Sequence, residues 1–599
     1  MDEPIINQHM IQIDPICGMP IDTEKAQFKA KIRGSSYYFC NEEHKRSFLE
    51  SPRIAYFSME VGLKSEMPTY SGGLGVLAGD TIRSSADLKI PLVAVTLLSR
   101  KGYLKQKITD SGDQLEYPED WNPSRFLRPL PEAVNVRIEG NEVKIKSWIY
   151  DHQSPTGGLV PVLFLDTDLQ ENSLDDREIT SFLYGGDNRY RLKQEIVLGI
   201  GGVRMLEALN FKIRKYHMNE GHSSLLTLEL LKRNGTDADR TRDLCVFTTH
   251  TPVAAAFDKF SYADVQKLLG EEFPPGDIKK YAGVDNLNAT YLALNLSKYV
   301  NGVTNAHMEY SRKLFPGYHL RGITNGVHPC RWTCEFFREL FDRYIPGWAN
   351  EPELLVRMDE VPYGEIWNAH LKAKKALLDH IVEKTGVIMD INVLTLGFAR
   401  RATAYKRATL LFSDLERLKE INRTGKLQFI FAGKAHPKDD AGKRVIKEIY
   451  NYMAGLRGEI EAVYLENYDM DLAARMVSGV DVWLNTPLPP MEASGTSGMK
   501  AACNGVINFS VLDGWWIEGC IEGVNGWAIG PYPMVPIGEN ERRRIEIKDL
   551  YNKMEYLIIP KFYHDRDGWR EMMRSSISKT AYYFNSHRMM RRYITEAYL

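Results

Sequence analysis

The sequence alternates between short apolar segments and amphipathic segments, and this alternation runs through the chain twice. PLVAVTLL (residues 91–98) has the length and apolar character of a strand buried on both faces. In AHLKAKKALLDHIVEKTG (residues 369–386), apolar residues recur every three or four positions, as in a helix. Strands that alternate with helices predict parallel sheets covered by helices on both faces. Two such runs, with the second starting near residue 360, predict two doubly wound, Rossmann-like α/β domains that face a cleft.

The predicted strands divide between the two runs. The first run contains IAYFSMEV (54–61), PLVAVTLL, KYHMN (215–219), LCVFTTH (244–250) and GITNGV (322–327). The second contains VLTLGFA (393–399), LQFIFAG (427–433), EAVYLEN (461–467), DVWLNTP (481–487) and VINFSVLDG (506–514). Ligands of such sheets bind beyond the carboxyl ends of the strands, so the polar motifs that follow these strands are the candidate site. The predicted domains are a small α+β module over 1–52, the two Rossmann-like domains over 53–355 and 356–575, and a C-terminal helix over 576–599 that packs back on the first domain.

The composition excludes several classes of protein. A formal net charge of -2 gives no electrostatic reason to bind nucleic acid or an anionic membrane. Apolar runs long enough to cross a bilayer are missing, and the first fifteen residues are too polar for a signal peptide. Seven sparsely spaced cysteines do not form a disulfide framework. We therefore expect a cytoplasmic enzyme with reduced thiols and no nucleic-acid or membrane partner.

The segment MEASGTSGMK (residues 491–500) is the most informative motif. Its small residues from Gly495 to Gly498 predict a tight loop that opens a helix, where free backbone N–H groups attract a phosphate. The hydroxyls of Thr496 and Ser497 add donors. Lys500 lies just inside the helix, and a poorly hydrated lysine there can form a Schiff base with an aldehyde next to that phosphate. On spacing alone, a surface lysine at a helix start remains the alternative.

Four cations follow the strand VLTLGFA within the segment FARRATAYKRATLL (residues 398–411). If a helix begins near Thr403, Lys406 lies in its first turn, which is unfavourable for a cation unless an anion binds there. Arg400, Arg401, Lys406 and Arg407 are therefore candidates for a phosphate site. A solvated basic face is the alternative.

The segment TYSGGLGVLAGD (residues 69–80) follows the first α/β strand and contains a glycine loop. Gly73, Gly75 and Ala78 match the dinucleotide fingerprint GxGxxA. The acidic residue expected about twenty positions later is missing, since the chain there reads PLVAVTLL. The sequence thus argues against a nicotinamide dinucleotide as the ligand.

EASGTSGMK, followed by NG and LDG, closely resembles the cofactor-lysine motif of the glycogen and starch phosphorylases. The FARRATAYKRA and GGLG segments match that family as well, and the resemblance runs from about Ile54 to Leu599. It implies a glycosyltransferase fold of the GT-B type and pyridoxal 5′-phosphate bound covalently to Lys500. The other cofactor-binding residues implied are Thr496, Ser497, Gly72, Gly73, Gly75 and Trp332.

The resemblance also implies a sugar and phosphate site. Arg401 and Lys406 match the residues that bind the substrate phosphate, and His250 matches a glucose-contacting histidine; these three are the implied catalytic residues. The implied substrate-binding residues are Arg400, Asn325, Glu492, Ser494, Gly495, Asn219, Glu220 and His222. Four positions depart from the family pattern: Ser497-Gly498 replaces Gly-Asn, Arg400 replaces a lysine, and Glu220 replaces an aspartate. RYRLKQE, with Arg191 and Lys193, also matches, and we expect it to be a structural helix.

The reaction that the resemblance implies is phosphorolysis of α-1,4-glucans such as glycogen or maltodextrin. Inorganic phosphate receives the terminal glucosyl unit, with retention of configuration, to give α-glucose 1-phosphate. A nucleotide-sugar-dependent glucan synthase of the same fold is one alternative, and a non-catalytic glucan-binding or metal-sensing protein is another. The sequence leaves the oligomeric state open, with a homodimer as the hypothesis.

Residues 1–52 differ in pattern from the rest of the chain. DPICGM, then YYFC, then a helix starting near Glu42 resembles a YHS-type module, which often accompanies metal-handling proteins. Cys17, Cys40 and His44 are the types of ligand that hold a soft or borderline metal. Two buried thiols, a docking site for a partner and a redox sensor are the alternatives.

Overall fold

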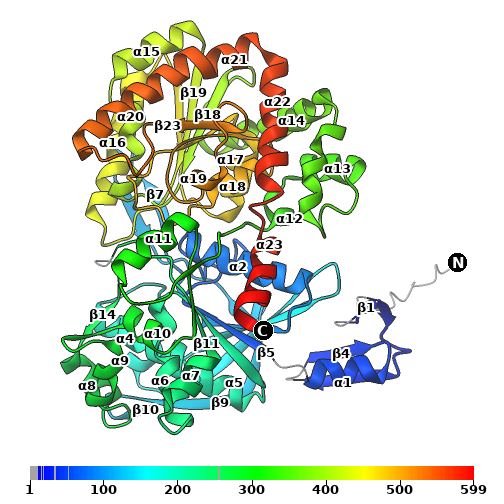
Figure 1. Ribbon diagram of the computed structural model, residues 1–599, viewed down its shortest axis with the longest axis vertical. Helices are drawn as coiled ribbons and strands as arrows, with labels where there is room; N and C mark the ends of the chain where they lie inside the picture. The colour runs from blue at the N-terminus through cyan, green and yellow to red at the C-terminus, as the bar shows by residue number, and fades with distance from the viewer. Residues whose placement is uncertain (1–10, 15–16, 18, 33–34, 51–52, 254–256) are drawn as a thin grey trace, which may run out of the picture.

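The computed structural model describes residues 11–14, 17, 19–32, 35–50, 53–253 and 257–599. Two large sheets lie one above the other along the long axis, and a small N-terminal segment lies beside the first of them (Figure 1). Among the helices described, none has both the length and the apolar character needed to cross a membrane.

The first sheet has nine strands within the described residues, in the order β17-β16-β13-β12-β5-β6-β11-β10-β9. Neighbours from β17 to β11 are parallel, whereas β10 and β9 form an antiparallel extension at one edge. The parallel strands are β5 (Arg53–Ser58), β6 (Leu92–Leu97), β11 (Leu159–Asp166), β12 (Ile213–Asn219), β13 (Cys245–Thr248), β16 (Tyr299–Gly302) and β17 (Arg321–Gly322). The extension consists of β9 (Arg128–Ile138) and β10 (Asn141–Gln153).

The predicted strand at 322–327 is wrong beyond Gly322, where β17 ends. The chain then leaves the sheet, because Asn325 turns into the cavity described below and Pro329 begins helix α12 (Pro329–Trp332). Proline starts a helix readily but cannot continue a strand ladder.

The second sheet contains six parallel strands within the described residues, in the order β20-β19-β18-β21-β22-β23. They are β18 (Leu394–Ala399), β19 (Leu427–Ala432), β20 (Glu461–Leu465), β21 (Val482–Asn485), β22 (Ile507–Val511) and β23 (Gly526–Ile529). Trp483, Phe429 and Phe509 are fully buried in this sheet's core, where α14 (Tyr363–Thr385) and α17 (Met470–Gly479) also pack. The predicted α/β class with parallel sheets is confirmed, whereas the boundaries at residues 52, 355 and 575 remain predictions.

The C-terminal helix α23 (Ser586–Tyr593) packs against α2 (Gly73–Asp87) of the first sheet (Figure 1). Asp87, at the end of α2, accepts hydrogen bonds from Nε2 of His328 at 2.7 Å and from Nε2 of His587 at 2.8 Å. Nδ1 of His328 accepts the backbone N–H of Arg331, so its Nε2 carries the proton and donates. This cluster is therefore a hydrogen-bonded clasp between three segments.

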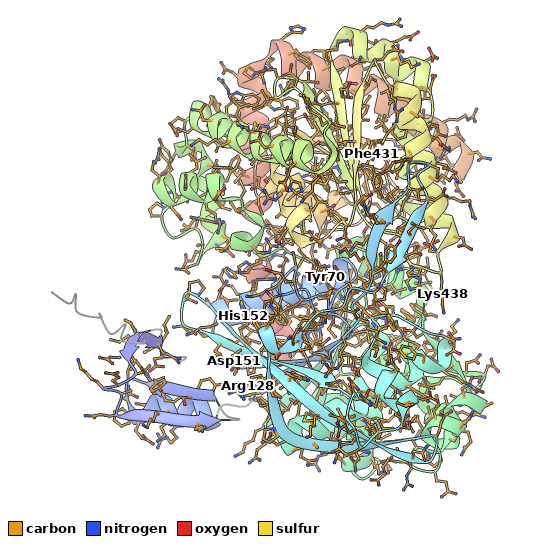
Figure 2. All side chains as sticks on the ribbon, turned by 180° about the vertical axis from the view of Figure 1, so that it is seen from behind. Tyr70, Arg128, Asp151, His152, Phe431 and Lys438 are labelled. Carbon is orange, nitrogen blue, oxygen red and sulfur yellow. The ribbon has the colours of Figure 1, made fainter. Side chains whose placement is uncertain are left out.

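The N-terminal segment contains the ribbon β1 (Ile11–Ile13) and β2 (Pro20–Asp22), the hairpin β3 (Phe28–Ile32) and β4 (Ser35–Phe39), and helix α1 (Glu42–Glu50). Asn41 caps α1, since its side chain accepts the N–H of His44 at 2.7 Å. Tyr37 donates to Asp151 of β10 at 3.4 Å and packs near Leu159 of β11. Figure 2 shows Asp151 and Arg128 on the side of the sheet that faces this segment. The segment thus lies at the antiparallel edge, away from the second sheet.

Candidate active site

A cavity of about 1260 Å³ lies between the carboxyl ends of the two sheets. From the first sheet it receives the loops after β5, β12 and β13, and from the second sheet the loops after β18 and β21. This is the place where parallel α/β sheets bind ligands. Of the site residues predicted outside the N-terminal module, the cavity lining includes Lys500, Thr496, Ser497, Gly72, Gly73, Trp332, Arg400, Arg401, Lys406, His250, Asn325, Glu492, Ser494, Gly495, Glu220 and His222.

Lys500 lies on the short helix α18 (Ser497–Ala502), with its Nζ 4.0 Å from the ring centre of Trp332. Burial lowers the pKa of Lys500 to about 8, so a larger share of the amine is neutral near physiological pH. Thr496 is the N-cap residue of α18, yet its side chain makes no capping bond. The hydroxyl of Ser497 accepts the indole N–H of Trp483 at 2.9 Å. The predicted loop before a helix is thus present, and it presents its lysine to the cavity.

The glycine loop begins α2 on the opposite side of the cavity. A side chain at Gly72 or Gly73 would meet open space, whereas one at Gly75 would come within 2.7 Å of the Glu60 carboxylate. Glu60 fixes the loop, because its Oε2 accepts the N–H of Ser71 at 2.6 Å and the N–H of Gly72 at 3.2 Å. Gly75 is therefore required for close packing, while Gly72 and Gly73 leave room beside the loop.

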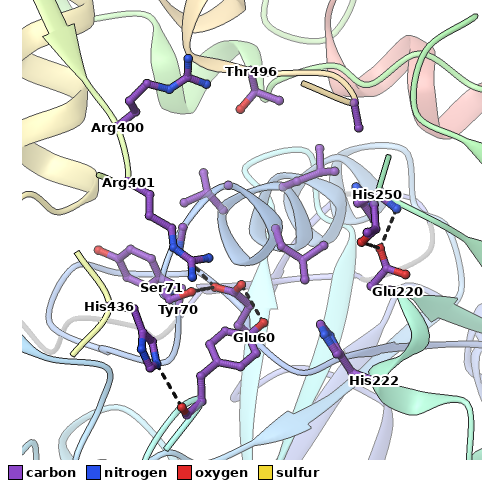
Figure 3. A pocket seen from close by; sticks show the side chains of 18 of the residues that line it. Glu60, Tyr70, Ser71, Glu220, His222, His250, Arg400, Arg401, His436 and Thr496 are labelled. Carbon is purple, nitrogen blue, oxygen red and sulfur yellow. Dashed lines mark hydrogen bonds between the residues drawn. The ribbon is translucent and has the colours of Figure 1, made fainter. Parts of the chain in front are cut away.

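The predicted cation cluster follows β18, but a 3-10 turn (Ala404–Lys406) replaces the expected α-helix at Thr403. Arg400 donates to Oε2 of Glu492 at 2.6 Å, and Lys406 donates to the same oxygen. Among the described residues, Nε and Nη1 of Arg400 are buried without a partner. Arg401 points across the cavity toward Ser71 and Glu60 (Figure 3). The fourth cation, Arg407, lies outside the cavity lining, and its Nη1 is 2.5 Å from Oε2 of Glu546.

The charges of this cluster depend on one another. Burial and, to a smaller extent, the nearby Arg400 lower the pKa of Lys406 to about 7, although Glu492 opposes them. Burial opposes the ionisation of Glu492, but Arg400 and Lys406 outweigh it and hold its pKa at about 2. Glu492 in turn is held by Asp513, which accepts its backbone N–H at 2.9 Å. Cations that converge in a buried pocket, with free donors left over, suit an anion that can accept several hydrogen bonds.

His250, just after β13, forms a neutral pair with Asn219, the last residue of β12. Nε2 of His250 lies 2.6 Å from Oδ1 of Asn219, and burial lowers the pKa of His250 to about 3, so its ring is uncharged at neutral pH. Glu220 has a φ of 72° and a ψ of 172°, a conformation that costs a residue with a side chain about 1–3 kcal/mol. Its carboxylate accepts the N–H of His250 at 2.7 Å and the hydroxyl of Thr251 at 2.8 Å. Glu220 therefore orients the His250 loop.

Two further predicted residues carry buried polar atoms that lack a partner among the described residues. They are Oδ1 of Asn325 and Nδ1 of His222, and both residues line the cavity. Buried polar atoms are normally hydrogen-bonded, so such atoms along a cavity wall indicate a polar ligand. Ser494 and Gly495 form the turn between Glu492 and Thr496, with Gly495 at a φ of 70°. A ligand rich in hydroxyl groups would supply hydrogen bonds to Oδ1 of Asn325 and Nδ1 of His222.

Sequence reasoning missed several residues of the cavity. Glu60 follows β5 and accepts the hydroxyl of Tyr184 at 2.9 Å, and Asp258 lies 3.4 Å from Nε2 of His222. Arg191, expected to be structural, also lines the cavity, with its guanidinium 4.5 Å from the Tyr184 ring centre. The only sequence signal for Glu60 was that it is the one charged residue of the predicted strand 54–61, which in the structure ends at Ser58.

Comparison with known proteins supports the same interpretation as the geometry of the cavity. The carbohydrate phosphorylase family matches residues 277–525. A maltodextrin phosphorylase from Thermococcus litoralis is 39% identical, over 100% of this chain and 74% of its own length. Glycogen phosphorylases from Aquifex aeolicus and Mycobacterium tuberculosis are 37% and 35% identical, each over 91% of this chain and over 86% and 70% of their own lengths. The chain belongs to the carbohydrate phosphorylase family.

Membership of the phosphorylase family confirms the resemblance drawn from EASGTSGMK and its companion segments. The family match covers the second sheet up to β22 and includes Lys500, Glu492 and the 398–411 cluster. Because the family match starts at residue 277, it does not include the glycine loop or His250. The Thermococcus relative, by contrast, aligns with the whole chain.

Proposed function

We propose that this phosphorylase is an α-glucan phosphorylase that uses pyridoxal 5′-phosphate on Lys500. It transfers the terminal glucosyl unit of an α-1,4-glucan to inorganic phosphate and releases α-glucose 1-phosphate. One observation carries the proposal. The same cavity is lined by a lysine with a lowered pKa, by a buried cluster of cations, and by neutral polar side chains that can hydrogen-bond sugar hydroxyls.

The residues around Lys500 fit the cofactor. The Lys500 amine can bind the aldehyde, the open space beside Gly72 and Gly73 can accept a phosphate, and the hydroxyl of Thr496, which makes no capping bond, adds a donor. The Trp332 ring closes the pocket behind the lysine. When bound, the cofactor supplies a phosphate group that can exchange protons with the substrate phosphate near neutral pH.

The protein's own residues bind and orient the two substrates. Arg400 and Lys406 would hold the substrate phosphate, with Arg401 reaching from the other side, so that its negative charge stabilises an oxocarbenium-like transition state. Once the phosphate takes the place of Glu492 beside Arg400 and Lys406, the Glu492 carboxylate would be available to accept hydrogen bonds from sugar hydroxyls. His250 and Asn325 offer uncharged polar groups to the same sugar.

The first test is a direct assay. Purified protein incubated with maltodextrins and inorganic phosphate is expected to release α-glucose 1-phosphate, and its absorption spectrum is expected to show bound pyridoxal. A nucleotide-sugar-dependent synthase would instead lack the cofactor absorbance and would extend glucan only from a nucleotide sugar. Release of free glucose with no phosphate ester would contradict the proposal.

We also propose that the N-terminal segment binds a metal ion. One ligand atom from each of Asp14, Cys17, Cys40 and His44 lies within 4.8 Å of all the others. The two sulfurs are 3.4 Å apart, and Nδ1 of His44 lies 2.9 Å from Oδ2 of Asp14. Asp14, which sequence reasoning did not include, is fully buried and supplies the fourth ligand.

The arrangement fits a tetrahedral zinc ion. Two ligands at Zn–S distances of about 2.3 Å would place the sulfurs about 3.8 Å apart, a few tenths of an ångström wider than here. Burial raises the pKa of Cys40 to about 12, with Cys17 and Asp14 acting in the same direction, so the thiol keeps its proton unless a cation displaces it. With a carboxylate, two thiolates and a neutral imidazole as ligands, the formal charge of the occupied site would be about -1, so the ligands more than neutralise the ion.

Elemental analysis of the purified full chain is expected to give about one zinc per chain, and cobalt substitution should give thiolate-to-metal absorption. Cys17→Ser combined with Cys40→Ser should remove both signals and leave phosphorolysis intact, because the segment lies at the far edge of the first sheet. Cys520→Ser, which alters a half-buried thiol near the second sheet, is the matched control that should keep the metal. A wild-type protein that takes up neither ion would disprove the site.

A further inference from the structure

Helix α2 carries a buried acidic side chain, Asp80, midway between the glycine loop and the Asp87 clasp. Only 1% of Asp80 is exposed. We infer that Asp80 is a positioning residue for Lys500: it holds the Trp332 ring beside the amine and supplies a nearby negative charge. The inference deepens the proposed function, because it concerns the lysine that is proposed to bind the cofactor.

The contacts of Asp80 tie together the elements around the lysine. Its Oδ2 accepts the indole N–H of Trp332 at 2.7 Å and the backbone N–H of His328 at 3.1 Å, so it fixes both ends of α12. Its Oδ1 accepts from Arg83 at 3.2 Å. The indole ring held in this way lies 4.0 Å from Nζ of Lys500, within the range of a cation–π contact.

A second contact fixes the other side of the Trp332 segment. The side chain of Asn504, just after α18, donates to the carbonyl of Trp332 at 2.8 Å and to the carbonyl of Lys500 at 3.1 Å. Trp332 is therefore held through its ring by Asp80 of α2, and through its backbone carbonyl by Asn504, which follows the helix of Lys500. Its position relative to the amine is fixed by hydrogen bonds on both sides.

The charged groups around Lys500 act in opposite directions. Burial lowers its pKa, Arg331 and Arg83 lower it further, and Asp80 gives the largest opposing effect, with a smaller one from Cys503. Because an amine attacks an aldehyde only in its neutral form, this balance sets the pH at which the lysine becomes reactive. Loss of the Asp80 charge removes the main group that stabilises the ammonium form, so the pKa of Lys500 should fall.

The test measures the lysine itself, in the full chain freed of bound aldehyde. Trace labelling with acetic anhydride at a series of pH values, followed by peptide mass spectrometry, gives the midpoint at which Lys500 becomes reactive. We expect a midpoint near pH 8 for the wild type, matching the lowered pKa of about 8. In Asp80→Asn we expect it at least about one unit lower, so that labelling at pH 7 rises about fivefold.

Asp87→Asn is the matched control, since it makes the same change on the same helix two turns away and should leave the Lys500 midpoint unchanged. Asp80→Glu keeps the charge and should restore most of the wild-type midpoint. Trp332→Phe keeps a ring but offers a weaker cation–π face that Asp80 no longer holds in place, so it should also lower the midpoint, and it serves if Asp80→Asn does not fold. An unchanged or higher midpoint in Asp80→Asn and in Trp332→Phe would overturn the inference. The labelling needs no cofactor, so failure of pyridoxal loading in the wild type would count against the proposed function alone.

Discussion

Lys500→Ala is expected to yield a folded protein that holds no pyridoxal phosphate after gel filtration and has lost phosphorolysis by about a thousandfold or more, the scale on which removal of a catalytic component acts. Lys500 is the one residue proposed to bind the cofactor covalently, and its pKa of about 8 suits that bond. The cofactor absorbance and the release of glucose 1-phosphate from maltodextrin are the two measurements.

Lys375→Ala provides the matched control for this variant. Lys375 lies on α14 with an exposed side chain that pairs with Asp379. Its replacement should leave both the absorbance and the rate unchanged. Full glucose 1-phosphate release by Lys500→Ala without added cofactor would contradict the assignment of Lys500.

Lys406→Ala is expected to raise the phosphate concentration needed for half-maximal rate by about a hundredfold or more. The reason is that Lys406 and Arg400 converge on one carboxylate oxygen, which marks the position where a phosphate oxygen can be held. Steady-state rates at varied phosphate and saturating maltodextrin test this. Because Arg407 pairs with Glu546 and lies outside the cavity lining, Arg407→Lys is the control that should leave the phosphate requirement nearly unchanged. An unchanged requirement in Lys406→Ala would remove Lys406 from the phosphate site.

The same lysine predicts a pH dependence with a definite sign. Since burial lowers the pKa of Lys406 to about 7, the free site loses this positive charge as the pH rises through 7. Phosphate should therefore bind more weakly above pH 7, and its arrival should draw a proton onto Lys406. Lys406→Arg, which stays charged, should flatten the dependence of the phosphate requirement between pH 7 and 9. A wild-type requirement that is constant over this range would contradict the shift.

Much of the fold follows from local pattern. The apolar runs that precede Arg400 and Glu492 are strands β18 and β21. They could be predicted because the apolar pattern of a buried strand is visible within a few neighbouring residues. The antiparallel extension β9–β10 was not predicted, since its strands are half exposed and do not fit the continuous apolar pattern of the others. The expected helix at Thr403 is a 3-10 turn, because the backbone there turns through Arg407 at a φ of 47°.

The sequence by itself determined the α/β class and the family, and it singled out Lys500 as the proposed cofactor lysine, because these depend on motifs in which neighbouring residues act together. Only the tertiary structure decided which distant residues meet. It brought Asp14 to the two cysteines, Asp80 to the Trp332 ring and Glu492 to Arg400, across separations in sequence that no spacing rule covers. Burial explains why these partners matter, since a charge removed from water must find a counter-charge or hydrogen bonds wherever the fold provides them.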